Sequence, residues 1–186
     1  MRIISGNFKG KKILPPKDKK TRPLRDLVKE SIFNLILHSK KLNCYIDNSN
    51  ILDLFSGTGS FGLECISRNS EMITFFENYD EALYILKKNI RSLDAENKCT
   101  IIEEDCFEFF KNKKTFKEKF DIIFMDPPYS EIKINLLINS ILEKKILKDN
   151  GILIIHRHKK DNIDISNKLK ILDQRTYGIS KIIIGN

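Results

Sequence analysis

Phe120-Asp-Ile-Ile-Phe-Met125 runs directly into Asp126-Pro-Pro-Tyr129, and this stretch decides the fold. The mostly apolar run predicts a strand that is buried on both faces, which is typical of parallel sheets. Two consecutive prolines end it, because proline has no N–H to donate to a neighbouring strand. The residue before a proline is restricted to extended backbone, so Asp126 is expected at the carboxyl end of the strand. Ligands of open α/β sheets bind at that edge, which makes Asp126 and Tyr129 candidate site residues.

Strands and helices alternate along the rest of the chain. Apolar runs predict strands at residues 50–55, 72–77, 100–104, 120–125 and 152–156, and helical spacing predicts helices at 24–37, 60–68, 79–93, 105–111 and 131–144. Two further strands, at 169–173 and 179–184, flank a turn at Arg175-Thr-Tyr-Gly178 and suggest an antiparallel hairpin. The alternation predicts an α/β fold with a mostly parallel central sheet and helices on both of its faces.

The net charge of +8 is concentrated at the N-terminus of this 186-residue chain. Residues 1–25 hold nine basic side chains against Asp18 alone, whereas residues 26–186 hold 24 basic and 24 acidic ones. A basic segment on an otherwise neutral domain is the pattern expected for a polyanionic partner, although a merely solvated face has the same composition. We therefore predict a basic extension over residues 1–24, with strands at 2–5 and 11–14 and a proline-rich linker, followed by the main domain over 25–186.

Several classes of protein are disfavoured by composition. No run approaches the roughly 18 apolar residues of a membrane span, and the N-terminus lacks the apolar core of a signal peptide. The four cysteines show no CxxC spacing and no histidine partners at ligand intervals. The expectation is a globular cytosolic protein with reduced thiols, no metal site and no membrane partner.

A glycine-rich loop follows the first predicted strand. Ile51-Leu-Asp-Leu-Phe55 leads into Ser56-Gly-Thr-Gly-Ser-Phe-Gly62, whose glycines fit GxGxxG, and Glu77 closes the next strand. This pattern is also that of an NAD site, which stays open as an alternative. Asp53, however, would repel a pyrophosphate at the helix N-terminus, whereas a cationic amino-acid moiety such as that of S-adenosylmethionine (SAM) tolerates it.

Each candidate cofactor residue has a specific expected role. Glu77 would accept hydrogen bonds from both ribose hydroxyls, with Asn78 beside the adenosine. In SAM-dependent methyltransferases an acidic residue after the third strand contacts the adenine amino group, and Asp105 occupies that position, followed by Cys106. The loop residues Phe55, Ser56, Gly57 and Gly59 complete the predicted cofactor-binding set.

The Asp-Pro-Pro-Tyr tetrapeptide suits a planar base that carries an amino group. Such an amine is a poor nucleophile, because its lone pair is delocalised into the ring. Hydrogen bonds from its two N–H groups to the Asp126 carboxylate and the Pro127 carbonyl would direct the lone pair at the methyl donor. Tyr129 would stack on the base, and Pro128 keeps the turn stiff. A base within a helix has to be unpaired or flipped out to reach such a site.

Taken together, these residues resemble the bacterial RsmD family, whose members methylate N2 of a guanine in 16S ribosomal RNA. The resemblance begins with Arg2-Ile-Ile-Ser-Gly6 and Phe8-Lys-Gly10, and it includes Asp53–Glu64, Glu77 and Asp126–Tyr129. Thr21-Arg-Pro23 and Val28-Lys-Glu-Ser-Ile-Phe-Asn34 point to this family in particular. It implies a Rossmann-like SAM-dependent methyltransferase fold, SAM as cofactor, and the guanine 966 site as target. The implied partner is 16S rRNA, within a partly or fully assembled small subunit, bound by a monomer.

The resemblance also suggests where RNA is bound. Thr21 and Arg22 lie where the family's N-terminal segment passes close to the site, and Lys9, Lys11, Lys12 and Arg25 are further candidate RNA contacts. The family usually has small hydroxyl residues after Arg-Pro, where this chain has Leu24. His156 and His158 follow the fifth predicted strand. With no partner for either in the sequence pattern, we interpret them as strand-end residues near RNA rather than as a general base.

The sequence leaves three alternatives open. An adenine-N6 methyltransferase would use the same tetrapeptide, although DNA enzymes of that type usually carry a target-recognition insert for which this chain has no room. An NAD-dependent oxidoreductase would use the glycine loop. A non-catalytic RNA-binding protein on a decayed methyltransferase fold is disfavoured by the intact Asp126.

Overall fold

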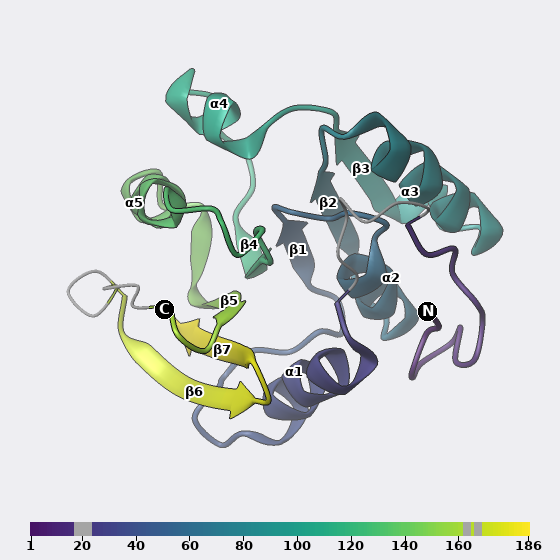
Figure 1. The fold of residues 1–186 in the computed structure, drawn as a ribbon, viewed down its shortest axis with the longest axis horizontal. Coiled ribbons are helices and arrows are strands. Elements are labelled where there is room, and N and C mark those ends of the chain that lie inside the picture. The colour runs from purple at the N-terminus through teal and green to yellow at the C-terminus, as the bar shows by residue number, and fades with distance from the viewer. Residues whose placement is uncertain (17–23, 162–164, 166–168) are drawn as a thin grey trace.

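A computed structural model describes residues 1–16, 24–161, 165 and 169–186, and within them seven strands form a single sheet (Figure 1). The strand order is β3-β2-β1-β4-β5-β7-β6. The strands are β1 (Asn50–Asp53), β2 (Met72–Phe76), β3 (Cys99–Ile102), β4 (Phe120–Met125), β5 (Leu147–His158), β6 (Ile171–Tyr177) and β7 (Ser180–Gly185). The first five are parallel, and β7 pairs antiparallel with both β5 and β6. The predicted mostly parallel sheet with an antiparallel C-terminal hairpin is confirmed.

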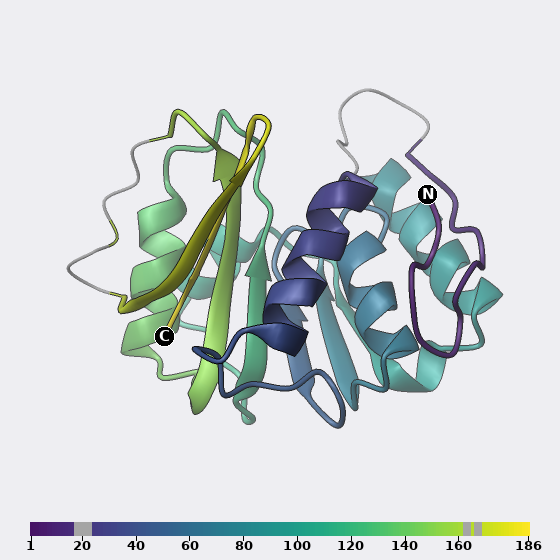
Figure 2. The ribbon, with the colours of Figure 1, turned by 90° about the horizontal axis from the view of Figure 1, so that it is seen from below.

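Helices cover both faces of the sheet (Figure 2). The helices are α1 (Asp26–His38), α2 (Ser60–Ser67), α3 (Asp80–Ser92), α4 (Cys106–Lys111) and α5 (Ile134–Glu143), with a short 3₁₀ turn at Glu96–Lys98. Alternate side chains of β4 enter different cores: Ile122 and Phe124 pack with α1, α2 and α3, whereas Ile123 and Met125 pack with α4 and α5. This division explains why the strand is apolar along nearly its whole length.

Most predicted element boundaries differ from the structure by one to three residues, and the largest differences are at the start of β5 and the end of β6. β5 begins at Leu147, five residues before the apolar run at 152–156, because Leu147 already pairs with Phe120, and the polar residues 148–151 form an irregularity before Ile152 pairs with Ile122. β6 continues through the predicted turn to Tyr177, which pairs with Ser180. The chain therefore reverses over two residues, and Gly178 at φ +60° supplies the left-handed conformation that such a turn requires.

The N-terminal segment folds back on itself, but it forms less regular pairing than the predicted hairpin. Arg2 and Lys12 make an isolated antiparallel bridge, while Ile3 and Ile13 next to them are buried in the core beside α1 and α2. The Glu64 carboxylate on α2 accepts hydrogen bonds from the backbone N–H groups of Ile4 and Ser5, at 2.7 and 2.9 Å. Residues 1–16 thus pack against the sheet domain through buried contacts.

None of the helices in the described ranges is long and apolar enough to cross a membrane.

Candidate active site

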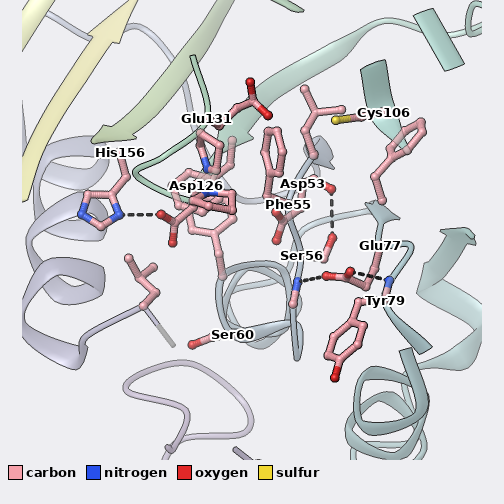
Figure 3. A pocket seen from close by; sticks show the side chains of 18 of the residues that line it. Asp53, Phe55, Ser56, Ser60, Glu77, Tyr79, Cys106, Asp126, Glu131 and His156 are labelled. Atoms are coloured by element: carbon pink, nitrogen blue, oxygen red, sulfur yellow. Dashed lines mark hydrogen bonds and ion pairs between the residues drawn. The ribbon is translucent and has the colours of Figure 1, made fainter. Parts of the chain in front are cut away.

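A cavity of about 360 Å³ opens at the carboxyl ends of the parallel strands. β1 lies between β2 and β4, so the chain's connections leave the sheet in opposite directions on its two sides, and such a switch point is where doubly wound sheets bind ligands. The strand ends contribute Asp53 from β1, Glu77 after β2, Asp126 after β4 and His156 from β5, and they surround the cavity together with the loops (Figure 3). The other predicted cofactor and target residues that line it are Phe55, Ser56, Gly57, Asn78, Asp105, Cys106, Pro127, Pro128 and Tyr129.

The glycine loop turns β1 sharply into α2. Gly57 and Gly59 have φ values of +53° and +86°, which place both in the left-handed region that favours glycine. A Cβ atom on Gly59 would also lie 2.5 Å from Leu86 Cδ1 on α3, closer than any real side chain allows. Gly59 is therefore required by the packing of the turn and is absent from the cavity lining, although the sequence pattern placed it there.

Asp53 is a buried carboxylate at the floor of the cavity. Asp53 is only 1% exposed, and its Oδ1 has no hydrogen-bond partner among the described residues. Burial, with the nearby charges of Asp126 and Glu77, raises the pKa of Asp53 to about 8. A carboxyl group in this state would gain strongly from a cationic partner.

Glu77 is held by backbone N–H groups from both sides of the cavity. Its Oε2 accepts from Gly57 N at 2.7 Å, and its Oε1 accepts from Asn78 N and Tyr79 N at 3.0 and 2.9 Å (Figure 3). Burial raises the pKa of Glu77, while these three hydrogen bonds act in the opposite direction. The carboxylate is thus fixed in one orientation and links the glycine loop to the start of α3.

Asp105 and Cys106 stand at the N-terminus of α4. The Asp105 carboxylate caps the helix by accepting from Glu108 N at 3.1 Å, and it also accepts from Asn78 Nδ2 at 3.4 Å. Cys106 is buried, which raises the pKa of its thiol. The sequence analysis missed Phe107. Its ring packs edge-to-face against Phe55, with the two ring centroids 6.1 Å apart, and gives this side of the cavity an apolar wall.

His156 has a partner, contrary to the sequence interpretation. Its Nδ1 lies 2.7 Å from Asp126 Oδ1, and both side chains are mostly buried (Figure 3). The register of β4 and β5 explains the contact: Met125 is paired with Ile155, so the next residue of each strand lies side by side. Each of the two residues directly follows an apolar run in the sequence, and that shared position was the signal that could have revealed the pair. Arg157, also missed, donates hydrogen bonds to the loop after Asp126.

Among the RNA-contact candidates in the described ranges, Arg25 is the one that lines the cavity. Arg25 and Leu24 line the cavity, and Leu24 is buried. Lys9, Lys11 and Lys12 are exposed beside the turn whose Asn7 and Phe8 N–H groups bond to Ser67 at the end of α2. Because α2 starts at the cavity, the turn at Asn7 and Phe8 lies about 12 Å along the helix from it. Lys12 lies nearer to the cavity end of α2, because it pairs with Arg2, whose carbonyl accepts a hydrogen bond from Lys29 beside Ser60. Thr21 and Arg22 fall outside the described residues.

Within the described ranges, no group of three His, Cys, Asp or Glu side chains is placed to hold a metal ion.

Comparison with known proteins places this geometry in a family. The model of the family described as Conserved hypothetical protein 95 matches residues 1–186. The ribosomal RNA small subunit methyltransferase D of Buchnera aphidicola is 37% identical over 161 residues, which cover 87% of this chain and 80% of the relative. Among solved structures, HI0767 of Haemophilus influenzae is 29% identical with a TM-score of 0.78, covering 99% and 96% of the two chains. SMU.776, solved in complex with SAH, has a TM-score of 0.65 at 18% identity, covering 85% and 49%. The chain therefore belongs to the RsmD family and is a methyltransferase with a Rossmann-like fold.

Proposed function

We propose that this enzyme transfers a methyl group from SAM to the exocyclic N2 amine of a guanine in 16S rRNA. The observation that carries the proposal is the convergence of Asp53, Glu77 and Asp126 on one cavity at the switch point of the sheet. Asp53 and Glu77 suit a cationic nucleoside, and Asp126 suits an amine. The relative from Buchnera aphidicola is named for the small-subunit ribosomal RNA, and that name supports the choice of substrate.

The residues present fit SAM. Asp53 offers a buried carboxylate oxygen that lacks a partner, and an ammonium group would supply one. Glu77 is oriented to accept hydrogen bonds from ribose hydroxyls, and Asp105, Cys106, Phe55 and Phe107 form the wall where adenine would lie. SAM, when bound, supplies a methyl group on a sulfonium sulfur, an electrophile that needs no activation by the protein.

Asp126 and Pro127 would orient the target amine. Its two N–H groups would donate to the Asp126 carboxylate and to the Pro127 carbonyl, which leaves the nitrogen lone pair free to attack. The negative charge of Asp126 then stabilises the positive charge that develops on nitrogen, and the proton leaves once the new N–C bond has formed. Tyr129 provides an aromatic face for the base, worth about 1–3 kcal/mol.

The same amine-holding chemistry would serve adenine, so the choice of guanine rests on the family. The family resemblance implies the guanine 966 site, and an unpaired or flipped nucleotide is required to enter the cavity. We propose that residues 1–24 and Arg25 contact the RNA backbone, that the methyltransferase domain over 25–186 acts as a monomer, and that the substrate is a partly or fully assembled small subunit.

Replacing Asp126 by Asn tests the mechanism. The isosteric amide keeps an oxygen for His156 but loses the charge that faces the developing cation, so methyl transfer to 16S rRNA should fall by about 10²–10³-fold. SAM affinity, measured by calorimetry, should remain within about twofold. Asp149→Asn, at an exposed position of β5, is the matched control and should behave as wild type. Full activity in the Asp126 variant would remove the proposed mechanism.

A further inference from the structure

We propose that His156 and Arg157, consecutive residues of β5, are positioning residues that hold the Asp126–Tyr129 loop in its reactive geometry. The inference rests on the proposed function, in which Asp126 and Pro127 orient the target amine. Neither side chain was expected to have this role from the sequence. Their contacts fix two different parts of the same loop, the carboxylate and the backbone.

His156 fixes the carboxylate. An ionised carboxylate has no hydrogen to donate, so the 2.7 Å contact is a hydrogen bond from His156 Nδ1–H to Asp126 Oδ1. This bond occupies one oxygen of Asp126 and leaves Oδ2 for the amine. It also selects a single rotamer, because the His156 ring is packed within the protein and only 8% of its side chain is exposed.

Arg157 fixes the backbone of the loop. Its Nη1 donates to Pro128 O at 2.9 Å, and its Nη2 donates to Tyr129 O at 3.2 Å and to Glu131 O at 2.8 Å. Asp161 forms an ion pair with Arg157 Nε at 2.8 Å and balances the buried charge. The guanidinium thus binds three carbonyl groups that follow Pro127 in the chain. The Pro127 carbonyl is not one of them, so it stays available as the second proposed acceptor for the amine.

The strand places the two side chains on opposite faces of the sheet. Neighbouring residues of a strand point to opposite faces of the sheet, so His156 shares the α1–α3 face with Ile154, and Arg157 shares the α4–α5 face with Ile155. Both faces of β5 are packed, which makes the strand a rigid support. Small errors in the placement of a reacting group cost large factors in rate, so a support of this kind should affect turnover more than binding.

The test compares substitutions that keep or remove each contact. His156→Asn retains an N–H donor near the position of Nδ1, whereas His156→Phe retains the ring and removes the donor. Arg157→Lys keeps the charge, and Arg157→Met removes every donor. His38→Asn and Arg91→Met, both at exposed positions, are the matched controls. For each variant, kcat and KM are measured with 16S rRNA and SAM, together with the affinity for SAM and the midpoint of thermal unfolding.

The phenylalanine and methionine variants should lose about 10–100-fold in kcat, with SAM affinity within about twofold, since partners that orient a functional group typically contribute that much. His156→Asn should recover most of the loss caused by His156→Phe, at assay temperatures well below the unfolding midpoint of each variant. A kcat within twofold of wild type for both His156→Phe and Arg157→Met would overturn the proposal, as would an asparagine variant that rescues nothing.

Hydrogen exchange of residues 129–133 in the free enzyme gives a readout that does not depend on the reaction. Arg157→Met should accelerate exchange of these amides by at least about tenfold, because their carbonyl neighbours lose the guanidinium. Unchanged exchange would overturn the positioning role of Arg157. A wild-type enzyme that fails to methylate 16S rRNA would remove the proposed function instead, and exchange would still decide whether Arg157 holds the loop.

Discussion

At the scale of single residues, Asp53 combines a cost in stability with a role in binding. Its carboxyl group is buried, Oδ1 has no partner in the described structure, and its pKa is raised to about 8 by burial and by the charges of Asp126 and Glu77. The unfolded chain would ionise this group near its ordinary value of about 4. The folded protein therefore holds a proton on Asp53 over several pH units in which the unfolded chain has released it.

Asp53→Asn should remove a pH dependence of stability. Between about pH 4 and 8 the folded state binds more protons at this site than the unfolded state, so the free energy of unfolding falls as pH rises through that window. By pH 8 this difference in proton binding lowers the free energy of unfolding by an amount on the order of a few kcal/mol. Urea unfolding of the two proteins at pH 5 and pH 8 measures it. The variant should gain in relative stability at pH 8, and an identical pH slope in both proteins would contradict the assignment.

SAM binding should release a proton from Asp53. A cationic partner favours the ionised carboxylate, so at pH 7, where the free enzyme holds the proton, binding should expel about one proton. Calorimetric titrations in buffers of different ionisation enthalpy give this number directly. Asp53→Asn should bind SAM more weakly and release no proton. Equal proton release by wild type and variant would assign the proton to another group.

At the scale of elements, β4 was predictable because an apolar run and two prolines define it. β4 was located to the residue, and Asp126 lies at its carboxyl end as the Pro127-Pro128 pair indicates. The contacts between strands were not predicted, because the register of β4 and β5 depends on tertiary packing. That register brings together His156 and Asp126, which are 30 residues apart in sequence.

In the N-terminal segment as well, the local sequence pattern did not predict the tertiary contacts. Its alternation predicted a hairpin, and the two arms are joined by one antiparallel bridge between Arg2 and Lys12 and by backbone hydrogen bonds around it. The burial of Ile3 and Ile13 against the core was not predicted. Gly59 shows a constraint of the same kind. Its pattern predicted a cofactor contact, and the structure also packs it against Leu86, a contact that no local sequence feature reveals.

Alanine substitutions at two glycines separate backbone strain from packing. Gly59 and Gly10 have nearly equal φ values, +86° and +83°, but an added Cβ clashes with Leu86 only at Gly59 and meets nothing within 4 Å at Gly10. Gly10→Ala should cost about 1 kcal/mol of unfolding free energy, the strain of the left-handed conformation, and Gly59→Ala should cost about 2–4 kcal/mol. Equal losses in denaturant unfolding would show that the clash is relieved without cost.

At the scale of the whole molecule, the basic N-terminal segment is built into the domain. Glu64, fully buried, binds the Ile4 and Ser5 backbone and forms ion pairs with Lys29 and Arg68, while Lys29 Nζ donates to Arg2 O at 3.0 Å. Burial lowers the pKa of Lys29, and the charge of Glu64 acts against that shift. This network fixes residues 2–5, so the turn that carries Lys9 and Lys11 has a defined place at the far end of α2 from the cavity.

Replacing Lys9, Lys11 and Lys12 together by Gln should weaken RNA binding without impairing chemistry. Each phosphate contact contributes about 0.7–0.9 to the slope of log affinity against log salt, so the slope should fall by about 2. Because none of the three lysines lines the cavity, kcat at saturating RNA should stay unchanged. Titrations at several salt concentrations measure the slope, and an unchanged value would make the basic turn a solubility feature only.

The most direct test of the proposed function is to map the methyl group. Unmodified 16S rRNA, alone and in small subunits, is incubated with the enzyme and isotope-labelled SAM, digested, and analysed by mass spectrometry to identify the base and position that carry the label. We predict label at N2 of a single guanine with the wild-type enzyme, and its loss with Asp126→Asn. Label at N6 of adenine, or no label in any rRNA substrate, would contradict the proposed function.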